Sequence, residues 1–493
     1  MDGANIQHLL AMILYMLAVI AIGIVFARRA NKDAESYFLG GRSLGPWVTA
    51  FSAEASDMSG YLLMGLPGLA YWTGLADAGW TCIGLALGTY LNFLITSRRL
   101  RRYSIAVDAF IGPVFSPKRY QGGRHKTLMM LSSLIIIIFF SVYAAQCLST
   151  CGKLFANLFG LSYQSMMIVA AAFVLIYTFL GGFLAESASD FMQAVVMVTV
   201  LVLILIMSVG AAGGLSAAIQ HAEGIDGFFS LVQSAAPSAT EVDVFGAAKP
   251  YGVLSIVSCL AWGLGYFGMP HILLRFMAIR EEKELNQSRR IATIWVVISM
   301  FIAVCIGIIG NSVTAAGKVP FLATSAESET IIIKLADLMS QHGVLLAVMA
   351  GIILSGILAA TMSTADSQLL AAASSVSQDL MQHSFGIKMN QRTTMLAARA
   401  TVICIAIIGM VLAWDPNSSV FRVVSFAWAG FGAAFGPVML FSLFWKRANK
   451  QGALAGMITG GAVVFIWKYL IAPMGGAWAI YELLPAFLAA CIA

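Results

Sequence analysis

Long apolar stretches separated by short polar ones run along the whole chain. About thirteen of them have the roughly 17 to 25 residues that a membrane-spanning helix requires. They cover approximately residues 8–27, 45–71, 76–97, 127–150, 163–183, 190–212, 250–274, 291–312, 344–375, 394–414, 419–445, 452–472 and 477–493. This pattern predicts an all-α polytopic membrane protein with about thirteen transmembrane helices, the last of them short and ending with the chain.

Composition supports the same class. Of the 493 residues, 60% are hydrophobic and only 11% are charged, so a soluble protein of this size would expose far too much apolar surface. The first apolar stretch follows Asp2 and precedes Arg28 and Arg29, which is the reverse of the charged start of a signal peptide. We therefore expect this stretch to remain as a span, with the N-terminus outside.

Basic residues predict which side faces the cytoplasm. Five loops hold 23 of the 29 Lys and Arg residues, and in an alternating topology all five lie on one side, namely 28–42, 98–126, 275–290, 388–399 and 446–450. The positive-inside rule makes that side cytoplasmic. Topology therefore explains the net charge of +6, which gives no argument for a nucleic-acid partner.

One apolar stretch is interrupted by polar residues at its middle. Residues 51–61 contain Glu54 and Asp57, three hydroxyls and a glycine. Ionisable groups at bilayer depth usually face a bundle interior or an ion path, and Ser, Asp and Gly weaken helical pairing. We expect a helix broken near its middle, with oxygens free to bind a ligand. The alternative is a polar seam that packs against a neighbouring helix.

A second broken span is predicted at residues 261–271. Three closely spaced glycines precede Pro270, which removes a backbone donor and crowds the carbonyl of Tyr266. This stretch is the fifth span after the first broken one, and an odd offset means that the two run in opposite directions across the membrane. Interrupted helices at matching positions of inverted halves indicate the binding site of a secondary transporter. A gating hinge would also explain the glycines, although it would not need Trp262 together with Tyr266.

A third polar cluster lies at residues 360–368. Ala360, Ser363 and Thr364 are spaced i, i+3 and i+4, which places one carbonyl and two hydroxyls on one helix face. Three hard oxygens suit a small alkali cation, whereas hydroxyls in membrane helices often bond back to the preceding turn instead. Together with the broken segment at Asp57, the cluster favours cation binding, and Asp366 adds a carboxylate beside it.

Several other functions lack support in the sequence. The two longer outside loops, 213–249 and 313–343, are too small for a catalytic domain, so we do not expect an enzyme. We find no metal-ligating His and Cys spacing, phosphate-binding loop or nucleophile motif that would indicate an organic cofactor. No obligate protein partner is evident, and the expected surroundings are the lipid bilayer.

Ungapped motifs at residues 36–46, 55–60, 62–67, 262–268, 270–272, 362–364 and 427–437 resemble the sodium:solute symporter family, specifically its bacterial sodium/proline symporters. The resemblance covers almost the whole chain. It implies a LeuT-like fold in one transmembrane domain, 1–493, with two inverted five-helix repeats at 45–212 and 250–445. One extra helix, 8–27, would precede the repeats, and two, within 452–493, would follow.

The resemblance also implies site residues. It implies a sodium site made by the backbone oxygens of Ala55, Met58 and Ala360 and the hydroxyls of Ser363 and Thr364. It links Asp57 to sodium use, and it assigns to the substrate site Tyr143, Trp262, Tyr266 and Pro270, with Ser59 and Gly60 near both ligands.

This sequence departs from the family pattern in places. Glu54 replaces an expected small residue, Met269 replaces a familiar glutamine, and residues 103–126 match the usual loop poorly. Asp190, Asp366 and Ser367 align with a second sodium site of some family members. Two acids that share a buried site could also hold a proton, so the number and kind of coupled ions stay open.

We therefore expect a symporter of the bacterial inner membrane that uses the sodium gradient to import L-proline by alternating access. The alternative within the family is a sodium- or proton-coupled symporter for another small solute, because Met269 borders the pocket. A channel or a solute sensor belongs to other classes. Single-channel current without coupling would indicate the first, and binding without uptake into sealed vesicles would indicate the second.

Overall fold

The computed structural model describes residues 3–30, 39–107, 126–237 and 245–493. Parts of three predicted loops, 28–42, 98–126 and 213–249, lie outside the described residues. The first residues of the motif at 36–46 and most of the atypical segment 103–126 also lie outside them.

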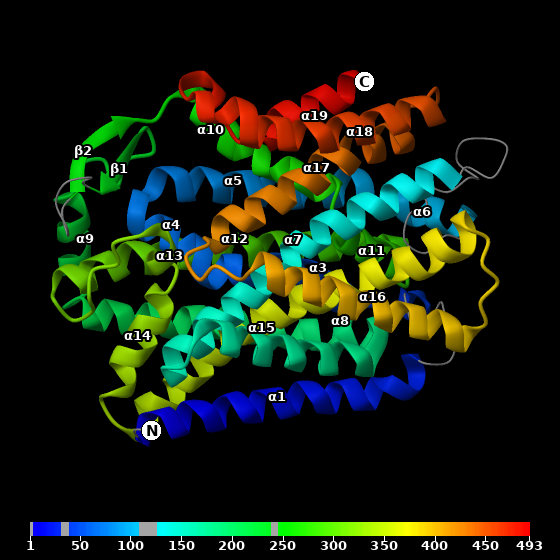
Figure 1. Ribbon diagram of the computed structural model, residues 1–493. Helices are drawn as coiled ribbons and strands as arrows, with labels where there is room; N and C mark the ends of the chain where they lie inside the picture. Colours follow the sequence, from blue (N-terminus) through cyan, green and yellow to red (C-terminus); the bar gives the residue numbers. More distant parts are fainter. Residues whose placement is uncertain (1–2, 31–38, 108–125, 238–244) are drawn as a thin grey trace.

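Helices account for nearly all of the described chain, and the long ones run side by side (Figure 1). The first half comprises α1 (Gly3–Ala30), η1 (Gly40–Arg42), α3 (Pro46–Gly60), η2 (Tyr61–Gly65), α4 (Leu66–Thr73), α5 (Leu75–Leu91), η3 (Asn92–Thr96), α6 (Ser97–Val107), α7 (Lys126–Phe159), α8 (Tyr163–Ala211) and α9 (Leu215–Glu223). A two-stranded antiparallel sheet follows, made by β1 (Gln233–Pro237) and β2 (Phe245–Pro250).

The second half of the chain is also made of helices. It comprises α10 (Val253–Leu260), η5 (Ala261–Phe267), α11 (Pro270–Ala278), η6 (Glu282–Glu284), α12 (Leu285–Ala315), α13 (Ser325–Ser328), α14 (Ile331–Ser340), α15 (Val344–Ser374), η7 (Ser375–Ser384), α16 (Gln391–Leu412), α17 (Val420–Phe444), α18 (Lys450–Ile466), η8 (Trp467–Ile471), η9 (Ala472–Met474), η10 (Gly476–Trp478) and α19 (Leu483–Ile492).

Each predicted apolar stretch coincides with a helix or a broken helix. The stretches 163–183 and 190–212 both lie in α8, which is interrupted at Gly182, where φ is 58°. By length and apolarity, the described residues include eight helices able to cross a membrane, and α10–η5 with α11 form a further span bent by 49°. The second predicted break is therefore confirmed as a bend between Phe267 and Pro270.

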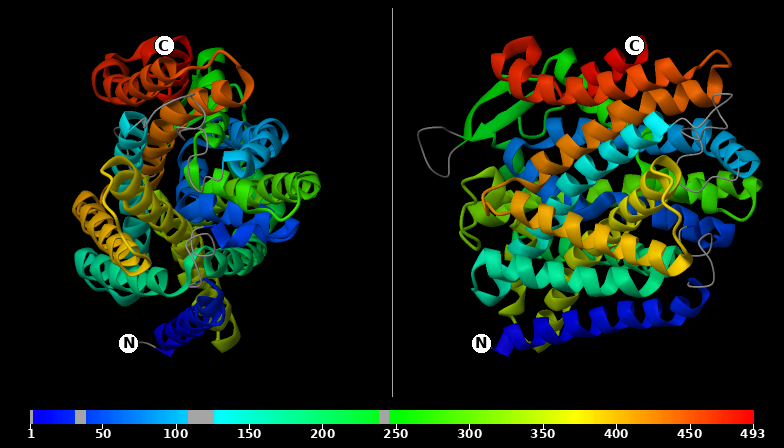
Figure 2. Two further views of the ribbon diagram at one scale, coloured as in Figure 1. Left: turned by 90° about the vertical axis from the view of Figure 1, so that its right-hand side faces the viewer. Right: turned by 45° about the vertical axis from the view of Figure 1, so that its right-hand side comes forward.

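The centre of the molecule is α3. Every residue of this helix from Ser52 to Gly60 is buried, and it packs against α8, α11, α12 and α15. Helix α1 covers α8 and α15 at one edge, and α18 and α19 lie along the opposite edge beside α17, as both views show (Figure 2). The polar residues of α3 are thus enclosed by other helices and kept away from lipid.

One predicted loop boundary is wrong. Arg275, counted with the cytoplasmic loop 275–290, lies within α11 and is fully buried. The loop begins only after Ala278, where Leu44 N–H donates to the Ala278 carbonyl at 3.1 Å. The apolar run ends one turn before the helix does, because the last turn buries a charged residue against acids on α8.

Glycine allows close contact between α5 and the second broken span. A Cβ atom at Gly84 of α5 would lie 2.8 Å from the Cα of Leu260 in α10, which is closer than carbon atoms can approach without movement of the backbone. The lack of a side chain at Gly84 therefore allows α5 and α10 to pack this closely.

We expect Gly84→Ala to reduce the free energy of unfolding by ~1–3 kcal/mol, because overpacking forces the two backbones apart. Thermal unfolding of the purified protein in detergent measures the change. The matched control is Gly461→Ala on α18, where an added Cβ meets no atom within 4 Å. Equal losses in the two variants would contradict the packing argument.

Candidate functional site

Helix α3 breaks where the sequence predicts. Ser59 has φ 42° and ψ −162°, a left-handed backbone conformation that residues with side chains rarely adopt. The Ser59 hydroxyl accepts a hydrogen bond from Tyr61 N–H at 3.1 Å, which stabilises the turn locally. The chain then continues as η2 and α4, so the polar segment from Ala55 to Gly60 ends at a helix break in the protein interior.

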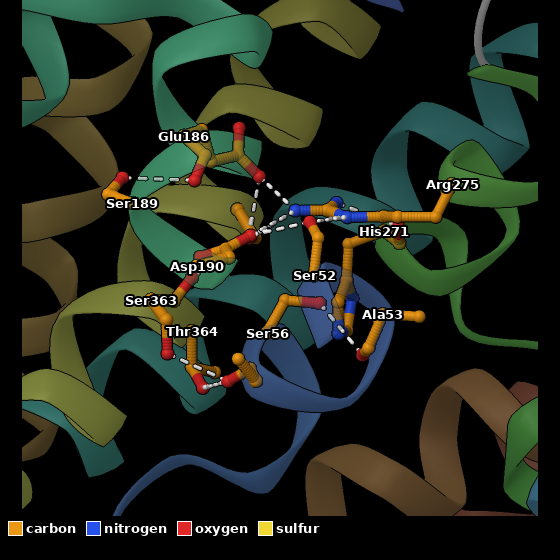
Figure 3. Close-up of polar contacts among 12 residues, drawn as sticks. Ser52, Ala53, Ser56, Glu186, Ser189, Asp190, His271, Arg275, Ser363 and Thr364 are labelled. Carbon is orange, nitrogen blue, oxygen red and sulfur yellow. Dashed lines mark hydrogen bonds and ion pairs between the residues drawn. The ribbon is translucent and has the colours of Figure 1, made fainter. Parts of the chain in front are cut away.

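Four of the five predicted sodium-binding oxygens converge on one point. The Ser363 hydroxyl lies 2.7 Å from the Ala55 carbonyl oxygen and 3.0 Å from that of Ala360. The Thr364 hydroxyl lies 3.5 Å from the first carbonyl oxygen and 3.2 Å from the second. All four residues are fully buried. The carbonyls and hydroxyls therefore form an oxygen cluster between α3 and α15 (Figure 3).

The fifth predicted oxygen is held differently. The carbonyl of Met58 accepts a hydrogen bond from Tyr61 N–H, across the break in α3. This carbonyl lies one turn after Ala55 on the same helix. Its bond to Tyr61 couples its position to the backbone of the broken segment.

Asp57 joins the two broken helices. Its Oδ2 atom accepts a hydrogen bond from the Tyr266 hydroxyl of η5 at 2.8 Å, and its backbone carbonyl accepts one from the Tyr143 hydroxyl of α7 at 3.3 Å. Both tyrosines are almost completely buried. Two of the predicted substrate residues therefore contact the predicted sodium-linked acid directly.

Trp262 belongs to an aromatic cluster next to the break in α3. Its ring stacks on Tyr61 at 5.7 Å and on Tyr481 at 4.9 Å between centroids, and it lies 5.3 Å from Phe421. Its backbone carbonyl accepts a hydrogen bond from the Trp428 indole at 2.8 Å. These rings come from η2, η5, α17 and the turn before α19.

Gly60 and Pro270 act through the backbone. A Cβ at Gly60 would lie 2.8 Å from Nε2 of Gln146 on α7, so only glycine allows this approach. Pro270 is the first residue of α11, and Met269 before it is extended, with φ −81° and ψ 107°. Pro270 therefore fixes the start of α11.

Arg275 reaches into the protein between α3 and α8 (Figure 3). Its Nη2 atom donates to Asp190 Oδ2 at 3.1 Å and also forms an ion pair with Glu186, while Nε donates to the Ser52 hydroxyl at 3.0 Å. Ser52 in turn donates to Asp190 at 2.7 Å. A fully buried arginine thus occupies the middle of the cluster that contains Asp190.

Ser367 connects this cluster to the oxygen cluster. Its hydroxyl donates to the Ser363 carbonyl at 2.8 Å and lies 2.6 Å from Glu186 Oε1 and 2.7 Å from Arg275 Nη2. Asp366 lies beside Thr178 and close enough to interact electrostatically with both acids of α8. The residues predicted for a second cation site are therefore together, with a guanidinium among them.

Sequence reasoning missed Glu186 and Arg275. Glu186 lies between the predicted apolar stretches 163–183 and 190–212, four residues before Asp190, a spacing that places two acids on the same face of α8. That spacing could have identified Glu186 as a partner of Asp190 from the sequence. Arg275 was not recognisable in the same way, because a basic residue at the end of an apolar stretch is normally a boundary charge.

The chain matches the family model "Sodium:solute symporter family" over residues 37–460. The osmoregulated proline transporter OpuE of Bacillus subtilis is 40% identical over 490 residues, which cover 99% of this chain and 94% of that protein. Sodium/proline symporter 2 of Staphylococcus saprophyticus is 39% identical over 496 residues, which cover 99% of this chain and 92% of that protein.

Solved structures share the fold. A Na⁺-coupled sialic acid symporter in a substrate-bound outward-open state superposes with a TM-score of 0.76 at 18% identity, covering 99% of this chain and 97% of the other. Mhp1, a nucleobase-cation-symport-1 family transporter, in a closed conformation superposes with a TM-score of 0.56 at 12% identity. The match covers 94% of this chain and 94% of Mhp1. The fold is therefore that of the LeuT-like transporters, as predicted.

We expect Arg275→Gln to destabilise the protein by about 3–5 kcal/mol, because it leaves the carboxylates of Glu186 and Asp190 buried without their cation. Thermal unfolding in detergent measures the loss, and adding Glu186→Gln should recover part of it. As a control, Arg280→Gln removes an exposed ion pair with Glu284 and should leave the unfolding temperature nearly unchanged. A similar loss in both single variants would contradict this role.

Proposed function

The chain belongs to the sodium:solute symporter family, and we propose that it uses the sodium gradient to import L-proline by alternating access. The observation that carries the proposal is the convergence of the Ala55 and Ala360 carbonyls with the hydroxyls of Ser363 and Thr364 at the broken helix. The relatives named as proline transporters support the choice of substrate.

We propose that sodium binds the oxygen cluster. Carbonyl and hydroxyl oxygens suit a hard alkali cation, and two buried hydroxyls directed at the same carbonyls can rotate to present their lone pairs to an ion. Met58 would add its carbonyl from the next turn of α3. Asp57 supplies a negative charge nearby without touching these four oxygens, which fits a role in attracting sodium and linking it to the substrate.

We propose that proline binds beside the break in α3. Its apolar ring and secondary ammonium group suit the aromatic surface of Trp262 and Tyr266, with a cation–π contribution. Tyr143 approaches from α7, where its hydroxyl bonds the Asp57 carbonyl, and Ser59 with Gly60 would present backbone groups to the carboxylate. Pro270 would shape the pocket by fixing the start of α11. The side chains of Tyr143, Trp262, Tyr266 and Pro270 are all buried.

The proposed topology follows the prediction. Residues 45–212 and 250–445 would form the two inverted repeats, each beginning with a broken helix. Residues 8–27 and the two helices within 452–493 would flank them. The N-terminus would lie outside the bacterial inner membrane. No enzymatic activity, organic cofactor or obligate protein partner is proposed.

We propose that Arg275 takes the place of a cation at the predicted second site. Its guanidinium bonds Asp190 and Ser367, two of the three residues predicted there, and Asp366 lies nearby. An internal positive charge satisfies these acids without a second ion in this conformation. The sodium gradient and the membrane potential would then supply the energy, with about 2.3 kcal/mol per charge per 100 mV from the potential.

Uptake of labelled proline into proteoliposomes tests the function. We expect uptake to require an inward sodium gradient and to be stimulated by an inside-negative potential. Uptake of other small solutes but not proline would favour the alternative within the family. Uptake driven equally by a proton gradient without sodium would contradict sodium coupling.

Removing both hydroxyls with Ser363→Ala and Thr364→Ala should raise the sodium concentration for half-maximal uptake at least tenfold, which corresponds to about 1.4 kcal/mol. Proline affinity at saturating sodium should stay near that of the wild type. Sodium titrations of proline binding measure both quantities. The control is Ser355→Ala, a hydroxyl two turns earlier on α15 that bonds only within its helix. Unchanged sodium dependence in the double variant would remove these hydroxyls from the site.

Trp262→Ala should weaken proline binding by about 1–3 kcal/mol through the loss of apolar and cation–π contact, while sodium binding stays measurable. Calorimetric titration with proline measures the change. Trp47→Ala is the control, since Trp47 is half-exposed at the start of α3, away from the break. Equal proline affinity in Trp262→Ala and the wild type would exclude Trp262 from the binding site.

A further inference from the structure

Glu54 is a buried acid that the proposed transport cycle does not use. It lies one turn before Asp57 on α3 and is only 1% exposed. Its Oε2 atom has no hydrogen-bond partner among the described residues. A buried carboxylate without a partner is costly in the low-dielectric interior, so its presence requires a compensating group.

Two further unpartnered oxygens belong to the continuous segment α5–η3, and one of them lies beside this acid. The hydroxyl of Thr89 on α5 lies beside the Glu54 carboxyl group, and Asn92 is one turn further along at the start of η3. Thr89 is 0% exposed and Asn92 is 1% exposed. Within the described part of the chain, neither Thr89 Oγ1 nor Asn92 Oδ1 has a hydrogen-bond partner.

Tyr266 connects all of these residues. Its backbone carbonyl accepts a hydrogen bond from Asn92 Nδ2 at 3.0 Å, which leaves Asn92 Oδ1 free. Its hydroxyl donates to Asp57 at 2.8 Å, and Glu54 and Thr89 also lie close enough to interact with its side chain. The carboxyl groups of Glu54 and Asp57 and the Thr89 hydroxyl therefore lie beside the Tyr266 side chain, whereas Asn92 lies at its backbone carbonyl.

Charge distinguishes this cluster from the one on α8. Arg275 bonds Glu186 and Asp190, but no Lys or Arg side chain of the described residues bonds Glu54 or Asp57. A proton on Glu54 would provide one donor and leave other oxygens unpartnered. A small alkali cation can be bound by several carboxylate, hydroxyl and amide oxygens at once.

We propose that Glu54, Asp57 and Thr89 bind a second sodium ion, separate from the one assigned to Ser363 and Thr364. The new site lies on the α5 side of α3, whereas the oxygen cluster lies on the α15 side. Asp57 and Tyr266 connect it to the proposed substrate pocket. The transporter then carries two sodium ions with each solute molecule. This inference rests on the proposed function only because it takes the oxygen cluster at Ser363 and Thr364 as the first sodium site.

Equilibrium binding of ²²Na⁺ to the purified full chain in lipid nanodiscs tests the proposal. The wild type should bind two ions at saturation and Glu54→Gln one. At the lowest sodium concentration that saturates the wild type, Ser363→Ala with Thr364→Ala should leave the other site mostly empty, and the combined variant should bind almost no sodium. If Glu54→Gln still binds two ions, the new site is wrong; if the hydroxyl variant still binds two, the oxygen-cluster assignment is wrong.

Two further variants keep the test decisive if Glu54→Gln folds poorly. Thr89→Val keeps the shape of the side chain and should raise the sodium concentration needed to fill the second site several-fold. Asp77→Asn makes the same acid-to-amide change elsewhere on α5, where Tyr251 bonds the carboxylate, and should retain two ions. A wild type that binds one sodium ion and takes up one proton, with the proton lost in Glu54→Gln, would overturn the assignment to sodium.

Discussion

The backbone break at Ser59 is the constraint on which the rest of the structure depends. In a bilayer, backbone groups that leave a helix must find partners inside the protein, because lipid offers none. The structure meets this requirement by surrounding α3 with other helices and by directing Ser363, Thr364 and Tyr143 at its carbonyls. The same contacts that make the break tolerable also place oxygens where a cation and a solute can be held.

Two sets of buried ion pairs hold together the helices that surround the break. In one set, Arg275 ties α11 to the acids of α8 and to Ser52 of α3. In the other, Lys153 of α7 pairs with Glu329 at 2.9 Å, and Glu329 accepts a hydrogen bond from Val420 N–H at the start of α17. Buried pairs are strongly destabilised by the loss of one partner, so each fixes the relative position of the helices that it joins.

The sequence was sufficient for the architecture because spans and breaks are local properties. Hydropathy located the apolar spans, and Ser59 and Pro270 marked the two broken ones. The oxygen cluster could also be expected, since Ser363 and Thr364 share a helix face. The position of Arg275 could not, because its acidic partners lie 85 and more residues away in the sequence and only packing brings them together. Tyr481 was missed for the same reason: it reaches Trp262 from near the end of the chain.

The geometry also accounts for coupling between the proposed ligands. Ala55 offers its carbonyl to the proposed sodium, and Ser59 with Gly60 borders the proposed solute four residues later on the same interrupted helix. Ordering of this segment by one ligand reduces the conformational cost of binding the other. Such linkage must be reciprocal, so the factor by which sodium raises proline affinity equals the factor by which proline raises sodium affinity, typically about 1–3 kcal/mol. Because Asp57 bonds Tyr266 across the two broken helices, a change at either ligand reaches both halves of the proposed site through one hydrogen bond.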